Sequence, residues 1–240
     1  MVDDIRRLGI VITGHFHPST FSPAWFRLHD LVGPEDTENA DVHFIAGPLA
    51  SLTIGTMGVH VQETFFNVFT EIPQEFDGLR DVVVGAISLL ESPVSSLTIN
   101  SHLHWVAQSR DAWHHFGDIL APKQVWKPIL NVPGTRDVTV EGTRDDGWHG
   151  RIQVRVQPSA QVTPYGIYTV VSDHFLLKPA KHHATSRVDF TDPSLRPEPP
   201  PPSSANVPHL LEILDNQWSA CLDRAQRIFT HLTHLSRQRG

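Results

Sequence analysis

The residues of this sequence that could do chemistry are mainly histidines, of which the chain has 16. The most suggestive pair is His102 and His104, which are separated by one residue within a stretch of alternating apolar and polar residues. This spacing places two imidazoles on one face of a β-strand, where they could ligate a metal ion if a third ligand came from elsewhere. Because no carboxylate or cysteine stands at a matching spacing, we predict no metal site and expect solvent-facing polar side chains.

Other patterns that would indicate a reaction do not occur in the sequence. It has no phosphate-binding or dinucleotide-binding glycine loop, no HExxH or GxSxG motif and no cysteine pair. Asp173 and His174 are adjacent, but neighbours on a strand point to opposite faces and do not form an acid/base dyad. Cys221 lies in the apolar stripe of a helical segment, which favours a buried, unreactive thiol. We therefore assign no catalytic residue and no cofactor.

A polar face shared by several expected strands is the candidate binding surface. Polar or basic side chains oppose the apolar residues of their own strands at His15, His17, His60, Asn100, His102, His104, Arg151 and Arg155. A surface of donors and weak bases with almost no acid suits an anionic partner, and its affinity should rise as the pH falls through the histidine range. Alternatively, it is only the hydrated side of an antiparallel sheet.

The elements that must position this face are organised around the stretch 78–130. Apolar residues recur at helical spacing from Phe76 to Leu90, which predicts a core helix that ends before Pro93. The period then changes from 3.6 to 2, which predicts a strand over 94–106. Six more strands are expected at about 8–17, 41–54, 58–70, 136–144, 149–157 and 165–177. The predicted fold class is α+β, with a mostly antiparallel sheet of about seven strands, a central core helix, a helical insertion and a long C-terminal helix.

Three regions follow from the composition along the chain. Residues 1–195 form the main α+β domain, and the proline-rich residues 196–208 are typical of an extended linker. Residues 209–240 are expected to be a helix that packs on the main domain or on a partner. Its apolar stripe, the candidate interface, includes Leu211, Leu214, Trp218, Leu222 and Phe229.

The length and net charge of the chain limit the classes of protein to which it can belong. With 240 residues, 40% of them hydrophobic, the chain can bury one sizeable core. Lys and Arg number 19 and Asp and Glu 26, so the formal charge of −7 does not favour general binding to nucleic acid or to a membrane surface. The single cysteine, the acidic N-terminus and the lack of a long apolar run predict a cytoplasmic protein with no membrane association.

Two segments, together with the order of the elements, resemble a known family. The segments are Ser95-Ser96-Leu97-Thr98-Ile99-Asn100, after a helix that ends near Glu91, and the terminal pattern Leu214-Asp215, Leu222-Asp223-Arg224-Ala225 and Ile228-Phe229. They are similar to a sporadically distributed bacterial family of uncharacterised proteins of about this length. The resemblance implies a bacterial origin and an accessory role beside mobile-element or phage-defence genes, and it carries no activity with it.

These features predict a non-catalytic binding or scaffold subunit of a bacterial multi-protein system. The expected interaction is with a protein partner, or with a second copy of the chain, through the C-terminal helix. One alternative is an enzyme or small-ligand-binding protein with a histidine-lined site on the sheet face. Another is an accessory protein that binds single-stranded nucleic acid.

Overall fold

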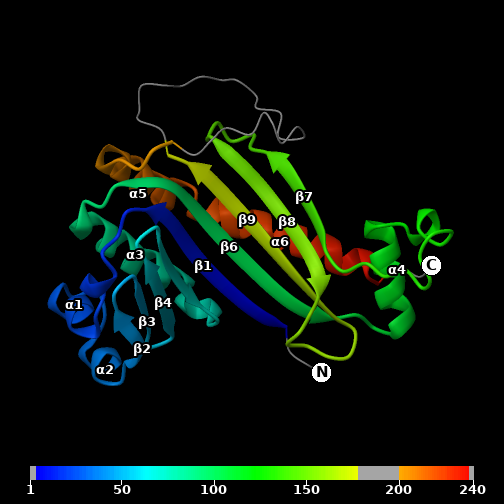
Figure 1. Cartoon of the computed structure of the whole chain (residues 1–240), viewed down its shortest axis with the longest axis horizontal. Coiled ribbons are helices and arrows are strands. Elements are labelled where there is room, and N and C mark those ends of the chain that lie inside the picture. Colours follow the sequence, from blue (N-terminus) through cyan, green and yellow to red (C-terminus); the bar gives the residue numbers. More distant parts are fainter. Residues whose placement is uncertain (1–3, 178–199, 238–240) are drawn as a thin grey trace.

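A computed structural model of the chain describes residues 4–177 and 200–237. It contains one antiparallel sheet of nine strands with helices against one of its faces (Figure 1). The strands are β1 (Ile5–Gly14), β2 (Asp41–Ala46), β3 (Leu49–Ile54), β4 (Met57–Gln62), β5 (Phe65–Thr70), β6 (Val94–Val106), β7 (Val138–Thr143), β8 (Gly150–Pro158) and β9 (Gly166–Leu176). The helices are α1 (Pro23–Leu28), α2 (Pro34–Glu38), α3 (Phe76–Leu90), α4 (Arg110–Leu120), α5 (Val207–Asn216) and α6 (Trp218–Leu235).

The α+β class is confirmed, but the sheet has nine strands where about seven were predicted. The expected strand over 41–54 is divided by a turn at Gly47 and Pro48, where Gly47 has a φ of 54°. Glycine adopts that left-handed conformation without steric cost, so the dipeptide closes a hairpin. The expected strand over 58–70 is likewise divided at Glu63 and Thr64, a two-residue turn that lacks the usual glycine or asparagine.

The sheet consists of two halves of similar but unequal topology, with five strands (β1–β5) in the first and four (β6–β9) in the second. Its strand order is β2-β3-β4-β5-β1-β6-β9-β8-β7. Each half begins with a central strand (β1 or β6), continues through a helical insertion to an edge strand (β2 or β7), and returns by antiparallel neighbours to pair with its own first strand. A helical region closes each half, α3 in the first and α5 with α6 in the second. β1 and β6 pair antiparallel and join the halves.

The core lies between the sheet and these helices. The predicted core helix is confirmed as α3, with Leu79, Val83 and Ile87 fully buried. α3 ends where Glu91 takes a left-handed conformation two residues before Pro93. A first apolar cluster joins α3 and α5 to the β1 side of the sheet, and a second joins α4 and α6 to β6, β8 and β9. Serine side chains cap α1 and α4, since Ser22 Oγ and Ser109 Oγ accept hydrogen bonds from Trp25 N and Ala112 N.

The C-terminal region differs from the single long helix that was predicted. It forms two helices, α5 and α6, which are separated at Gln217. The described end of the predicted linker lies against the main domain, because Ser203 bridges to Val94 and the buried Asn206 donates to the Val94 carbonyl at 2.7 Å. Residues 196–199 of that linker lie outside the described residues.

Candidate functional site

Six of the eight predicted polar-face residues lie on the same side of the sheet. We call this side, opposite α3, α5 and α6, the open face. It carries His60 on β4, Asn100, His102 and His104 on β6, and Arg151 and Arg155 on β8. In Figure 1, α6 passes behind β6, β9 and β8, and no helix of the described residues crosses in front of these strands.

His15 and His17 do not join the open face, contrary to the prediction of a strand over 8–17. β1 ends at Gly14, where its register with β6 shifts. A Cβ at Gly14 would lie 2.3 Å from the Pro93 carbonyl oxygen. The close approach of the end of β1 to the residue before β6 therefore requires glycine here. The chain then leaves the sheet, and both histidines are exposed beyond its end.

Tyr168 on β9 is the centre of the polar contacts on the open face. Its hydroxyl shares a hydrogen bond of 2.6 Å with His102 Nδ1, and its ring centroid lies 4.5 Å from that of His104. His104 Nδ1 in turn contacts Ser159 Oγ at 2.8 Å. The prediction omitted Tyr168, although its place on the open face follows from the expected strand over 165–177, in which Ile167 and Val171 point inward and Tyr168 points the other way.

The histidines of the open face are neutral near neutral pH. Burial and the charge of Arg7 lower the pKa of His102 to about 4. Burial and the charge of Arg151 lower the pKa of His174, which hydrogen-bonds Thr98, to about 4 as well. Burial also lowers the pKa of His60 and of His104. The expected rise in affinity for anions between pH 8 and 6 therefore has no basis in His102 and His174, and the lowered pKa of His60 and His104 acts against it as well.

The open face also carries more acid than was predicted. Arg151 Nε lies 3.5 Å from Glu141 Oε1, and Arg155 forms an ion pair with Asp137. The hydrogen bond from Arg155 lowers the pKa of the Asp137 carboxyl, which keeps it ionised. Both acids come from β7 and the residues before it, so the two arginines are partly neutralised across the strand boundary.

We expect acid to destabilise the fold through His102 and His174. Their pKa is about 4 in the folded state against 6.5 for the free side chain, so the unfolded chain binds more protons between these values. Stability should fall as the pH drops from about 6.5 towards 4, by roughly 2 kcal/mol per histidine at about pH 5. Urea unfolding near pH 7 and pH 5 measures this loss.

The double variant His102→Gln, His174→Gln should show a clearly smaller difference between the two pH values. His15→Gln, at an exposed position, is the matched control and should keep the wild-type difference. An equal loss of stability between pH 7 and pH 5 in the wild type and the double variant would show that His102 and His174 do not cause the destabilisation by acid.

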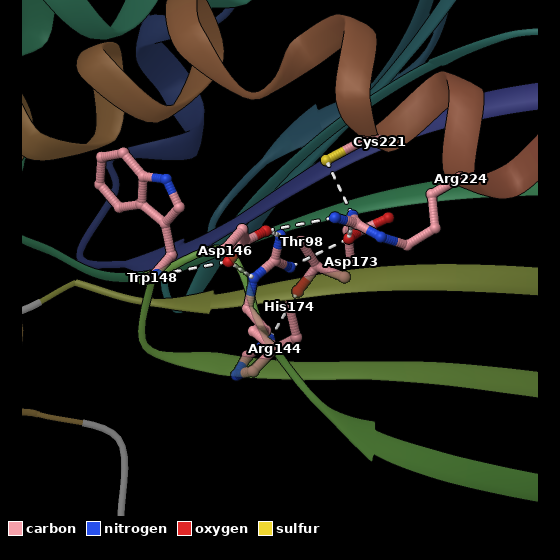
Figure 2. A network of polar contacts seen from close by, with 8 residues as sticks. All are labelled: Thr98, Arg144, Asp146, Trp148, Asp173, His174, Cys221 and Arg224. Atoms are coloured by element: carbon pink, nitrogen blue, oxygen red, sulfur yellow. Dashed lines mark hydrogen bonds and ion pairs between the residues drawn. The ribbon is translucent and has the colours of Figure 1, made fainter. Parts of the chain in front are cut away.

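On the opposite side of the sheet, a buried network joins the β7–β8 loop, β9 and α6 (Figure 2). Arg144 donates to both carboxylate oxygens of Asp146 and, at 3.0 Å, to Asp173 Oδ1. Arg224 of α6 donates to the same Asp173 oxygen and, at 3.2 Å, to Asp146. The Arg144 guanidinium also lies 3.7 Å from the centroid of the Phe175 ring. Two arginines and two aspartates thus compensate one another in a site with little solvent.

The protonation of this network follows from burial and pairing. Burial raises the pKa of Asp173, and the two arginines offset this only in part. Burial alone would raise the pKa of Asp146, but the hydrogen bonds and charge of Arg144 outweigh it and lower the value. Burial and the charge of Asp173 raise the pKa of the Cys221 thiol to about 12. The prediction that this thiol is buried is confirmed, and its raised pKa is in line with the expected lack of reactivity.

The sequence prediction that Asp173 and His174 point to opposite faces is also confirmed. Asp173 enters the network on the helix side, whereas His174 contacts Thr98 on the open face. The prediction missed Arg144, Asp146 and Arg224 as a group, because they come from two loop positions and a distant helix, with Asp146 and Arg224 already 78 positions apart in the sequence.

No protein-family model and no curated protein matches this chain. The resemblance to a sporadically distributed bacterial family therefore stays a prediction. Within residues 4–177 and 200–237, no group of three His, Cys, Asp or Glu side chains could hold a metal ion. Over the same ranges, every helix is too short or too polar to span a membrane.

The predicted interface stripe of the C-terminal helix packs on the chain's own sheet. Leu214, Trp218 and Phe229 are buried, and Leu211 and Leu222 are partly buried against the first apolar cluster. Trp218 also donates from Nε1 to Asp77 Oδ1 of α3 at 2.7 Å. Of the two arrangements expected for this region, packing on the main domain or on a partner, the structure shows packing on the main domain of the same chain.

Proposed function

We propose that the protein is a non-catalytic binding or scaffold subunit that engages a protein partner through residues 119–132, the apolar segment. This places the partner site in the helical insertion and not on the C-terminal helices, whose apolar side chains are occupied by the core. Membership of a bacterial multi-protein system beside mobile-element or defence genes belongs to the same proposal and rests on the family resemblance alone.

One observation carries the proposal: large apolar side chains are concentrated and exposed in this segment. Six of them are between 39 and 87% exposed, namely Ile119, Val125, Trp126, Ile129, Leu130 and Val132. Monomeric soluble proteins expose single apolar side chains commonly, but clusters of this kind mark interaction sites. Leaving them in water costs free energy that burial against a partner would recover.

The segment is also locally ordered, which favours a preformed surface. The Ile129 and Leu130 amides both donate to the Trp126 carbonyl, at 3.0 and 2.8 Å, which holds the three residues together in one turn. A tryptophan among aliphatic side chains has the composition of a binding hot spot. Figure 1 places α4, which leads into this segment, at the end of the sheet away from α1 and α2.

The two alternative functions are less well supported by the geometry. An anionic ligand on the open face, single-stranded nucleic acid included, would meet neutral histidines and arginines that already contact Glu141 and Asp137. A histidine-lined catalytic site would need a positioned acid or nucleophile beside the imidazoles. The nearest partners of His102 and His104 are instead the hydroxyls of Tyr168 and Ser159.

Replacing Trp126, Ile129 and Leu130 together by serine should abolish partner binding and leave the fold intact. Each change at an exposed site alters stability by about 0.5 kcal/mol or less, whereas loss of a tryptophan-centred hot spot weakens binding by about a hundredfold or more. The measurement is co-expression with proteins encoded by neighbouring genes. The complex mass is then read by light scattering and the affinity by calorimetry.

Leu28→Ser is the matched control, because Leu28 is 76% exposed but lies on α1 in the other half of the sheet. It should bind as the wild type does. A stoichiometric complex, or a dimer of the chain alone, that survives the triple replacement would show that the apolar segment is not the interface.

A further inference from the structure

A half-open cavity of about 260 Å³ lies in the second half of the sheet, between α4, residues 132–138 and the strands β8 and β9. Its walls are mainly apolar and include Trp113, Phe116, Leu120, Val138, Val156 and Ile167. Trp113 is fixed in the wall because its Nε1 donates to the Gly166 carbonyl at 3.2 Å. The cavity therefore has a defined shape.

The first half of the sheet shows that this space need not stay open. The corresponding insertion, between β1 and the edge strand β2, fills its own contact with the sheet by aromatic side chains. Phe21 and Phe26 are fully buried there, and Phe21 stacks on Phe66 of β5 with centroids 5.0 Å apart. Protein interiors are normally packed without large voids. The space between the helical insertion and the sheet is thus filled by side chains in the first half of the protein and left as a cavity in the second.

The charges around the cavity point to an anionic group on its occupant. The titratable side chains that line it are His114, Lys123 and Arg136, and no aspartate or glutamate lines it, on a chain of net charge −7. Lys123 is paired with Asp118 at 2.9 Å. Arg136 is exposed and forms no ion pair at contact distance within the described residues, although its charge also acts on the neighbouring Asp137, which is paired with Arg155.

We infer that this cavity binds a small amphipathic carboxylate, with its apolar tail under α4 and its carboxylate at Arg136. The volume exceeds the roughly 150 Å³ of an apolar cavity that holds benzene and falls below the roughly 300 Å³ at which drug-sized pockets begin. A short aliphatic or aromatic acid matches that size. Its tail replaces water against apolar walls, and its head forms a charge-assisted hydrogen bond with the guanidinium.

The test uses the full chain and octanoate as the probe, followed by isothermal titration calorimetry, with octanol as the uncharged analogue. Octanoate should bind at one site, and octanol about threefold to fivefold more weakly. Gly117 of α4 provides the blocking variant, because a Cβ there would meet only Thr135 atoms, at 3.7 and 3.8 Å. Gly117→Leu should fill the cavity and weaken octanoate binding at least about tenfold.

Gly117→Ala is the matched control, since it removes the same helical glycine without filling the cavity, and it should bind octanoate nearly as the wild type does. Arg136→Gln should bring octanoate down to the affinity of octanol and leave octanol unchanged. Absence of octanoate binding, equal affinities for the acid and the alcohol in the wild type, or binding that Gly117→Leu does not weaken would each overturn the inference. The cavity shares Leu120, Lys123 and Val132 with the apolar segment, but the titration uses the chain without a partner, and Gly117 and Arg136 lie outside residues 119–132. A failure of octanoate binding therefore leaves the proposed partner site untouched.

Discussion

Replacing Asp173 by alanine is expected to lower the free energy of unfolding by about 3 kcal/mol or more. Asp173 is 2% exposed and accepts hydrogen bonds from both Arg144 and Arg224. Its removal leaves three charged groups where four compensated one another, and the Arg144 side chain has no exposure to solvent. An uncompensated buried charge is far more costly than a neutral cavity, which is why the loss should exceed that of a single hydrogen bond.

The free energies of unfolding of the Asp173→Ala and Asp81→Ala variants are measured in urea and compared with that of the wild type. Asp81 is also paired with an arginine, Arg80, but its side chain is 66% exposed, so its loss should change stability by under about 1 kcal/mol. Equal effects of the two replacements would mean that the buried network contributes no more than a surface pair.

Periodic patterns predicted the elements of this fold where one face of an element is buried. α3 and β6 were placed from the change between periods of 3.6 and 2, because both have a continuous apolar face in the core. The hairpin turn at Glu63 and Thr64 was missed because neither residue has the φ preference that marks a tight turn. The similarity of the two halves was not visible either, since it is a similarity of topology and not of residues.

The candidate site was predictable only where it follows from a single strand. The alternation along β6 placed Asn100, His102 and His104 together, which the structure bears out in their position. The protonation of His102 depends on Arg7 and on burial by neighbouring strands, and the pairing of Arg151 depends on Glu141. The pattern of one strand could therefore predict neither the protonation state nor the ion pair. The buried network and the cavity under α4 likewise arise from tertiary contacts between distant segments.

Replacing Trp218 by alanine should lower the free energy of unfolding by about 3–5 kcal/mol. The side chain is 2% exposed, belongs to the first apolar cluster and donates to Asp77 of α3. Its loss removes apolar contacts, leaves a cavity and breaks the hydrogen bond to Asp77, which is exposed and can be solvated by water instead. Trp126→Ala is the matched control, because Trp126 is 49% exposed in the apolar segment, and it should change stability by about 0.5 kcal/mol or less.

The same experiment separates packing in cis from packing on a second copy of the chain. If α5 and α6 complete the core of their own chain, the unfolding midpoint is independent of protein concentration, in the wild type and in Trp218→Ala alike. If they completed the core of a neighbouring chain, the midpoint would rise with concentration, because association and folding would be linked. Chemical unfolding over a hundredfold range of protein concentration, on the order of 1 to 100 μM, reads this directly, and a midpoint that shifts with concentration would place the C-terminal helices in trans.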